Sequence, residues 1–275
     1  MALGVCRLSP RARAYPGCVH PYLQVDLPIA MAHRGFSLQG LENTMPAFAA
    51  AVDLGCTHVE TDVHATRDGV LVAFHDSGLD RLTDSTGQIA DLTWRQVSTA
   101  RVRGRAAVPL LEDVLGTWPD LRVNIDIKDW PAIGPLVEVL RRTSARNRVC
   151  VTSFDDRRTA AVRRALGPGL ATSPGSRGIT WWRLGSLLPG PMGARLSRIR
   201  TDAVAVQVPV NAGPLRVVTQ RSVDLAHRQG LQVHVWTVND AAQMHRLLDL
   251  GVDAVISDRA DTLMQVVRAR AVAAR

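Results

Sequence analysis

The sequence predicts an α/β protein built on a (β/α)8 TIM barrel. From Pro28 onward, short runs rich in Val, Ile and Ala alternate with helix-like segments, and this alternation occurs eight times. Most of the runs lack a regular apolar–polar alternation, as expected for parallel strands covered by helices. A length of 275 residues suits one such barrel. An open, doubly wound sheet is the alternative reading of the same pattern.

Each barrel strand is expected at one of these apolar runs. In chain order they are Ile29–Ala32, His58–Asp62, Arg122–Ile127, Arg148–Thr152, Leu170–Thr172, Ala203–Gln207, Gln232–Trp236 and Ala254–Ser257. Between them, the clearest helices each stop at a glycine, a common C-terminal signal. Thr44 is the expected N-cap of a helix that ends at Gly55, and Asp155 that of a helix over residues 156–166. Two further helices are expected over residues 222–229 and 241–250.

The domain organisation follows from two departures from this pattern. Residues 1–27 are rich in proline and arginine, and we expect a loose N-terminal extension before a barrel domain over residues 28–270. The extension contains no apolar run of the kind that a secretory signal requires, so a cytoplasmic location is the default expectation. Val70–Phe74 is an extra strand-like run. The turn-rich segment after it, about residues 77–108, predicts a small insertion over one end of the barrel.

Composition narrows the classes of partner. The net charge is +8, but the arginines are spread along the chain without a dense block, so nucleic acid is not expected as a partner. No apolar run is long enough for a transmembrane helix. Cys56 and Cys150 lie beside apolar runs and are expected to be reduced core residues, whereas Cys6 and Cys18 are too far apart for a CxxC metal clip.

The segment 175–200 has two readings. It combines Trp181 and Trp182 with several leucines and five arginines. A barrel helix with its loop is the favoured reading. Transient contact with an anionic membrane surface is the other, because tryptophan interleaved with arginine suits such an interface.

Three carboxylates mark a candidate metal site where strands end. Glu60 and Asp62 are two residues apart on one strand, so both side chains lie on the same face. Asp126 ends the next predicted barrel strand, and strand carboxyl ends share one face of a barrel. Three carboxylates form the hard oxygen set that suits Mg²⁺ or Ca²⁺. Alternatively, one or more of them pairs with Arg34 or Lys128.

Histidines and basic residues surround these carboxylates. His33 and His75 follow strands and are the candidates for proton transfer near neutral pH. Arg34 and Lys128 are candidates for binding a phosphate, and Lys128 is the only lysine in the sequence. Trp236 is either an apolar floor for a glycerol or similar group, or a core tryptophan.

These residues, taken in order, resemble the glycerophosphodiester phosphodiesterase family. The resemblance covers residues 30 to about 265. Its motifs are Ala32-His33-Arg34-Gly35, Glu42-Asn43-Thr44, Glu60-Thr61-Asp62-Val63, His75-Asp76, Asn124-Ile125-Asp126-Ile127-Lys128, Trp236-Thr237-Val238-Asn239 and Ser257-Asp258.

The resemblance implies a fold, a reaction and a set of residue roles. The fold would be a (β/α)8 barrel with an insertion after the second strand, and the reaction the hydrolysis of a small glycerophosphodiester to an alcohol and glycerol 3-phosphate. A divalent cation, Mg²⁺ or Ca²⁺, would bind Glu60, Asp62 and Asp126, with Asp126 standing where the family typically has Glu. His33 would act as base and His75 as acid, although the sequence does not fix that order.

Two rival functions fit part of the same pattern. One is a phospholipase C-like lyase on inositol phospholipids, which shares the paired histidines and metal. The other is a non-catalytic barrel that binds anionic ligands, which the intact histidines and carboxylates disfavour. The head group, the choice of metal and the oligomeric state are not indicated by the sequence.

Overall fold

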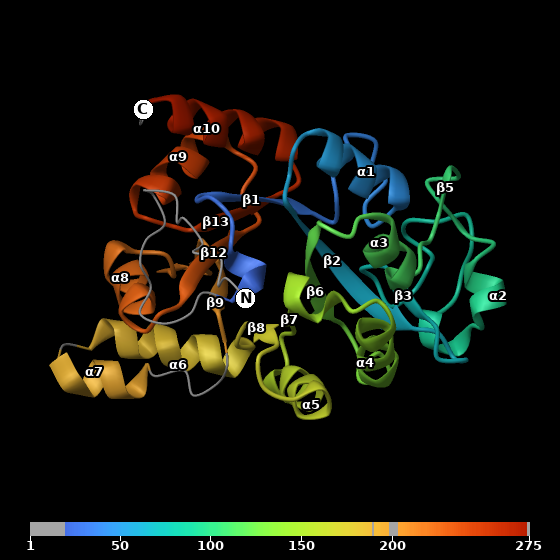
Figure 1. Cartoon of the computed structure of the whole chain (residues 1–275), viewed down its shortest axis with the longest axis horizontal. Coiled ribbons are helices and arrows are strands. Elements are labelled where there is room, and N and C mark those ends of the chain that lie inside the picture. The colour runs from blue at the N-terminus through green and yellow to red at the C-terminus, as the bar shows by residue number, and fades with distance from the viewer. Residues whose placement is uncertain (1–19, 189, 198–202, 274–275) are drawn as a thin grey trace, which may run out of the picture.

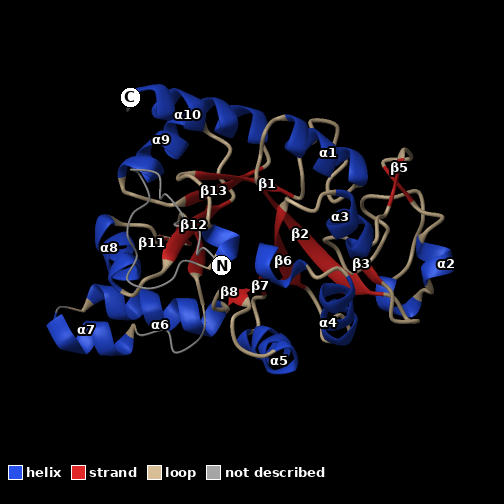
Figure 2. Ribbon diagram, in the orientation of Figure 1, coloured by secondary structure: helices blue, strands red, loops and turns tan. Residues whose placement is uncertain are grey.

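Eight parallel strands form the barrel in the computed structural model, which describes residues 20–188, 190–197 and 203–273 (Figures 1 and 2). Their order around the barrel is β8-β7-β6-β2-β1-β13-β12-β9, and a parallel bridge between Thr172 and Ala203 joins the two ends of this row. The closed arrangement confirms the barrel and excludes the open sheet. The strands are β1 (Ile29–His33), β2 (His58–Ala65), β6 (Arg122–Ile127), β7 (Val149–Thr152), β8 (Ala171–Thr172), β9 (Ala205–Pro209), β12 (Gln232–Trp236) and β13 (Ala254–Ser257).

A helix follows every barrel strand and covers the outside. These helices are α1 (Met45–Asp53), α3 (Leu111–Thr117), α4 (Ile133–Arg142), α5 (Asp156–Leu166), α6 (Ser176–Leu187), α8 (Gln220–Arg228), α9 (Ala241–Asp249) and α10 (Ala260–Ala273), with a 3-10 turn η3 (Ala145–Arg148) before β7. Thr44 and Asp155 cap α1 and α5 as expected. Helix α9 is capped by Asp240, which leaves the preceding Asn239 available to contact residues at the strand ends.

The insertion after β2 is a small lobe with its own core, at the right of Figure 1. Strand β3 (Leu71–Ala73) pairs antiparallel with β2. It is followed by η2 (Ile89–Asp91), α2 (Trp94–Val97), β4 (Arg101–Val102) and β5 (Ala106–Ala107). Phe74, Leu82 and Val97 are buried together in this lobe. Because its elements are so short, their periodicity could not be detected in the sequence.

Residues that precede the first strand close the barrel at the amino ends of its strands. A 3-10 turn, η1 (Pro21–Leu23), places Tyr22 inside the barrel, fully buried and edge-on to the ring of His58. Tyr22 packs with Cys150 and other residues of the barrel interior. The described part of the expected loose extension, residues 20–27, is therefore packed against the barrel, while residues 1–19, with Cys6 and Cys18, lie outside the described residues. Cys56 and Cys150 are buried free thiols, as expected.

The segment 175–200 begins as a barrel helix, the favoured expectation. Helix α6 turns back into α7 (Gly190–Leu196), and residues 189 and 198–200 lie outside the described part. The two helices approach so closely that a Cβ added at Gly185 would lie 2.5 Å from the Ser197 amide nitrogen. The two tryptophans differ, because Trp182 is 1% exposed in the core and Trp181 is 52% exposed. No helix in the described part is long and apolar enough to cross a membrane.

Candidate active site

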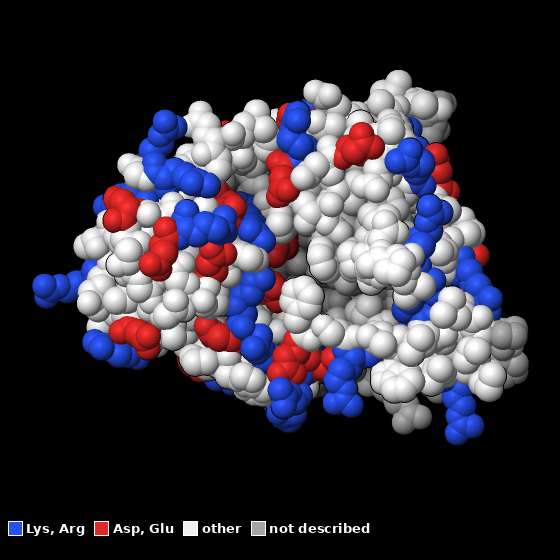
Figure 3. All heavy atoms as spheres, turned by 180° about the vertical axis from the view of Figure 1, so that it is seen from behind, with Lys and Arg blue, Asp and Glu red and all other residues white. Residues whose placement is uncertain are grey.

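The carboxyl ends of the strands open into a cavity of about 450 Å³. Figure 3, seen from behind Figure 1, shows a hollow in this face, with acidic and basic side chains along one side and a largely uncharged surface on the other. Every site residue predicted from the sequence lines this cavity: His33, Arg34, Glu60, Asp62, His75, Asp126, Lys128 and Trp236.

The three carboxylates come from adjacent strands in matching register. Asp62 of β2 pairs with Asp126 of β6, and Glu60 lies one inward-facing position below Asp62 on the same strand. Lys128 Nζ lies 2.7 Å from Asp62 Oδ1 and 2.7 Å from Asp126 Oδ2. Asp62 and Asp126 are therefore paired with Lys128, which was the alternative to metal binding expected from the sequence.

Arg34 provides the second cation of the cluster. It directly follows β1 in a left-handed backbone conformation, with φ of 56°. Its guanidinium lies 3.1 Å from Asp62 Oδ2 and donates to Glu42 Oε1 at 2.9 Å, while its backbone N–H donates to Glu60 Oε2. Asn43 donates a further hydrogen bond to Asp62 Oδ2. Asp62 thus faces cations and donors on both oxygens.

The pKa values of the three acids are shifted in different directions. Burial raises the pKa of Glu60 to about 8, and the nearby charge of Asp62 adds to this effect. Burial also raises the pKa of Asp126, against the opposing charge of Lys128. For Asp62, burial is outweighed by Lys128 and Arg34, which hold its pKa below the usual range. The cluster therefore carries more buried acid than its two cations neutralise.

The excess of buried acids over cations makes the cluster a candidate site for a metal ion. Among the described residues, no three metal-binding side chains already converge on one point, and the Lys128 ammonium lies between two of the carboxylates. However, Asp126 Oδ1 is buried without a hydrogen-bond partner in the described part of the chain, and Glu60 is held toward its protonated form. An all-oxygen set with an unsatisfied oxygen and excess acid fits a hard divalent cation.

His33 is held by a carboxylate from the opposite neighbouring strand. Its Nδ1 lies 2.6 Å from Asp258 Oδ1, and since a carboxylate only accepts, Nδ1 is the donor. Asp258 is itself held by the side chain of Asn239. The second ring nitrogen, Nε2, lies 3.7 Å from Glu60 Oε2. Although burial lowers the pKa of His33, the hydrogen bond to Asp258 and the charge of Glu60 raise it overall.

His75 has the same kind of support from the insertion lobe. Its Nδ1 donates to Asp76 Oδ1 at 2.6 Å. Arg81 binds both oxygens of Asp76 and also Glu42, the partner of Arg34. His64, which the sequence pattern did not single out, lies within hydrogen-bond distance of the His75 carbonyl. Both candidate histidines therefore fix Nδ1 on a carboxylate, which leaves Nε2 for proton transfer.

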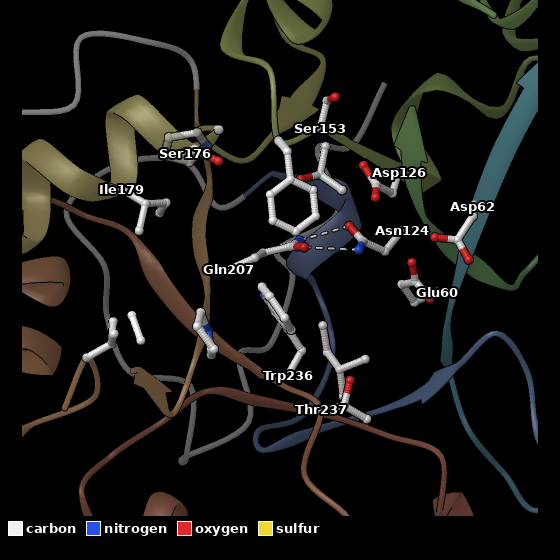
Figure 4. A pocket seen from close by; sticks show the side chains of 18 of the residues that line it. Glu60, Asp62, Asn124, Asp126, Ser153, Ser176, Ile179, Gln207, Trp236 and Thr237 are labelled. Carbon is white, nitrogen blue, oxygen red and sulfur yellow. Dashed lines mark hydrogen bonds between the residues drawn. The ribbon is translucent and has the colours of Figure 1, made fainter. Parts of the chain in front are cut away.

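A layer of amides and aromatic rings forms the floor beside the carboxylates. Asn124 and Gln207 exchange two side-chain hydrogen bonds across the barrel, as Figure 4 shows. Trp236 lies between this pair and Thr237 and packs edge-on against Phe154, with ring centroids 6.0 Å apart. Trp236 is partly exposed to the cavity, so it is not a tryptophan of the closed core.

Comparison with known proteins agrees with this geometry. The sequence profile of the glycerophosphoryl diester phosphodiesterase family matches residues 33–262. The chain belongs to this family. A relative from Mycobacterium tuberculosis, described as probable glycerophosphodiester phosphodiesterase 2, is 44% identical over 88% of this chain and 91% of its own length. Membership confirms the phosphodiesterase resemblance on which the candidate roles rest.

Solved structures share the barrel. A phosphodiesterase from Oleispira antarctica, solved with the product sn-glycerol 3-phosphate, has a TM-score of 0.71 at 23% identity, over 88% of this chain and 97% of that one. A glycerophosphodiester phosphodiesterase from Thermotoga maritima has a TM-score of 0.66 at 25% identity, over 86% and 98% respectively. These likenesses confirm the (β/α)8 fold class.

The supporting residues that were not assigned roles from the sequence include Asp76, Arg81, Asn239 and Asp258. Asp76, Asn239 and Asp258 belong to the motifs that carry the family resemblance, and each is a polar residue at or just beyond a strand end, but the sequence did not indicate which side chains they hold. The role of Arg81 could not be predicted either, because its approach to Asp76 depends on how the insertion lobe folds back.

Proposed function

We propose that the protein hydrolyses glycerophosphodiesters to glycerol 3-phosphate and an alcohol with the help of a divalent cation. One observation carries the proposal: two histidines, each with a carboxylate on Nδ1, line one cavity together with Arg34, Lys128 and three acids. Proton donors, proton acceptors and fixed positive charge around one space suit the cleavage of an anionic ester. The relative from Mycobacterium tuberculosis is named for the same substrate class, and the Oleispira antarctica structure holds the product sn-glycerol 3-phosphate.

The cation would be held by Glu60, Asp62 and Asp126. It would supply positive charge to the phosphoryl oxygens as negative charge grows there. Binding it would require Lys128 to release at least one of its carboxylates, because its ammonium now lies 2.7 Å from both Asp62 and Asp126. The released ammonium and Arg34 would then be free to bind phosphate oxygens.

His33 is proposed as the base and His75 as the acid. With Nδ1 donating to Asp258, His33 Nε2 can accept a proton from the substrate hydroxyl next to the phosphate-bearing carbon. That oxygen then attacks phosphorus, the bond from phosphorus to the head-group oxygen breaks, and His75 protonates the leaving alcohol. Water opens the resulting cyclic phosphate in a second step. An internal hydroxyl is favoured because it is already tethered close to phosphorus.

The first test is turnover of glycerophosphocholine by purified protein, with and without Mg²⁺ or Ca²⁺. His33→Ala and His75→Ala should each lower the rate on the order of a hundredfold or more, while His245→Ala, outside the cavity on α9, serves as a matched control. Chelation should abolish turnover, and Mg²⁺ or Ca²⁺ should restore it. Near-normal turnover by either histidine variant removes that residue from the mechanism, and full activity after exhaustive chelation contradicts the cation.

The nucleophile separates the hydrolase from the lyase alternative. A substrate with the neighbouring hydroxyl replaced by hydrogen should not be turned over, and phosphorus NMR of the normal reaction should end at glycerol 3-phosphate. Normal turnover of the deoxy substrate would rule out internal attack. Accumulation of cyclic phosphate as the end product would favour a lyase, and binding of glycerol 3-phosphate without any turnover would favour the non-catalytic barrel.

Transient contact with an anionic membrane surface is proposed for helices α6 and α7. Trp181, Leu187 and Met192 are exposed on them, next to the exposed Arg177 and Arg195, a combination that suits the boundary of an anionic bilayer. Trp181→Ala should weaken co-sedimentation with vesicles containing anionic lipid. Unchanged binding by this variant contradicts the contact. Trp182 cannot take part, because it is buried in the core.

A further inference from the structure

The short segment that carries His75 is fixed by backbone hydrogen bonds on either side of it. Before it, Phe74 N–H donates to the Asp62 carbonyl oxygen at 3.0 Å. After it, the Ser77 carbonyl oxygen accepts from Ile89 N–H at 2.8 Å. Between these two points, no backbone N–H among the described residues donates to the His75 carbonyl oxygen. The orientation of the His75 backbone therefore depends on side-chain contacts.

The side chain of His64 supplies a hydrogen bond to this carbonyl. Its Nε2 lies 3.1 Å from the His75 carbonyl oxygen, and its Nδ1 lies 2.6 Å from Asp129 Oδ2. A carbonyl oxygen and a carboxylate oxygen only accept, so both ring nitrogens donate. The Asp129 carboxylate is fixed in turn, because its Oδ1 accepts from Ala132 N–H at the start of α4. A continuous series of hydrogen bonds thus joins the start of α4 to the backbone of His75.

The position of His64 keeps it from touching a substrate. It lies on the same face of β2 as Glu60 and Asp62, because alternate residues of a strand share a face. However, it does not line the cavity, and it is only 6% exposed. Both of its ring nitrogens are engaged with protein oxygens. His64 therefore affects the site through the residues that it holds.

We infer that His64 is a positioning residue for the general acid. It fixes the backbone of His75, while Asp76 fixes the ring through Nδ1. Together these two contacts determine where His75 Nε2 lies, which is the atom proposed to protonate the leaving alcohol. The inference rests on the proposed function. Catalysis is steeply sensitive to small displacements of a reacting group, so loss of the contact with His64 should impair proton donation.

The effect should depend on whether the leaving group needs a proton. Choline would leave phosphorus as a strongly basic alkoxide unless His75 protonates its oxygen as the bond from phosphorus breaks. Nitrophenolate is a much weaker base and leaves as the anion. The 4-nitrophenyl ester of glycerol 3-phosphate keeps the same nucleophile and the same phosphate. The ratio of kcat/KM for glycerophosphocholine to kcat/KM for this ester, which we call the acid ratio, therefore reports the proton donor. It does not change with the fraction of enzyme that is folded.

Two amides at position 64 give a matched pair of variants. The glutamine amide reaches the place of Nε2 and can still donate to the His75 carbonyl, whereas the asparagine amide reaches the place of Nδ1 and contacts Asp129 instead. His64→Asn should lower the acid ratio by roughly tenfold, and His64→Gln should keep most of it. His227→Asn breaks a histidine–aspartate pair with Asp253 outside the cavity. This control should leave the acid ratio unchanged, even where it lowers the melting temperature.

The two catalytic histidines calibrate the acid ratio. His75→Ala removes the proton donor and should lower the ratio on the order of a hundredfold. His33→Ala removes the base, which both esters need, so it should lower turnover of both and leave the ratio close to that of the wild type.

The outcomes separate this inference from the proposed function. An unchanged acid ratio for His64→Asn, alongside a lowered ratio for His75→Ala, would overturn the positioning role alone. Equal losses in His64→Asn and His64→Gln would overturn the contact with the His75 carbonyl as its cause. Equal loss of turnover of both esters in His75→Ala would remove the acid from His75 and would overturn the inference with it. A wild-type protein that turns over neither ester would overturn both proposals.

Discussion

Asp258 is expected to position His33, and its replacement by Asn gives a quantitative test. The carboxylate accepts from His33 Nδ1 at 2.6 Å and so fixes the ring with Nε2 toward the reaction. Asn keeps the shape but removes the charge. A hydrogen bond to a charged group contributes about 1.5–3 kcal/mol, and the lower end applies because the Asp258 side chain is 53% exposed. About 1.5 kcal/mol corresponds to roughly a tenfold loss in kcat/KM for glycerophosphocholine.

The pH profile distinguishes positioning from a general loss of structure. Burial lowers the pKa of His33, and the hydrogen bond to Asp258 is the largest influence that raises it. Asp258→Asn should therefore lower this pKa. The base would then stay unprotonated to lower pH, and the acid limb of kcat/KM should move to lower pH. Asp261→Asn, the same change three residues along the chain and outside the cavity, is the control. An unmoved acid limb together with an unchanged kcat/KM would refute the reasoning.

Three further predictions concern stability. Lys128→Met leaves two buried acids without their shared cation, so it should lower the free energy of unfolding by about 3–5 kcal/mol in a chelator. Mg²⁺ or Ca²⁺ should restore much of that loss, and a melting temperature of the variant that does not respond to cation would contradict this. His58 is buried with its pKa lowered to about 3. The unfolded chain therefore binds this proton first, and stability should fall as pH decreases from about 6.5, by up to about 1.4 kcal/mol per pH unit from this group. In urea titrations His58→Gln should flatten that slope, and an identical slope in both proteins would refute the assignment. Gly185→Ala should destabilise the α6–α7 pair by about 1–3 kcal/mol, because a Cβ there would lie 2.5 Å from the Ser197 nitrogen. Melting temperatures equal to the wild type would show that α7 can move aside at no cost.

The barrel was predictable because its strands are local patterns. Most are short apolar runs, and several of the helices between them begin at a capping side chain, such as Thr44 or Asp155. Neither signal depends on distant residues. The site residues were predictable for a related reason, since the parallel topology brings all strand carboxyl ends to one face. The positions of Glu60, Asp62 and Asp126 along the chain were therefore enough to place the three acids together.

What depended on tertiary packing could not be predicted. The sequence allowed Asp62 and Asp126 either to face a cation or to pair with Lys128, and only the side-chain arrangement shows the ammonium between them. Likewise, adjacent tryptophans at 181 and 182 look equivalent in the sequence. One is buried and the other exposed because successive residues on a helix lie about 100° apart and α6 packs against the barrel on one side.

The position of Tyr22 changes where the folding unit should be taken to begin. A truncated chain that starts at Pro28 would keep every barrel strand and every residue of the site. It would lack the Tyr22 side chain, which fills the barrel at the amino ends of the strands. It would also remove the Tyr22 carbonyl, which lies 3.1 Å from His58 Nε2. A fusion partner or affinity tag is therefore better joined before His20, whose ring accepts a hydrogen bond from the Tyr22 N–H, than at the first residue of the first strand.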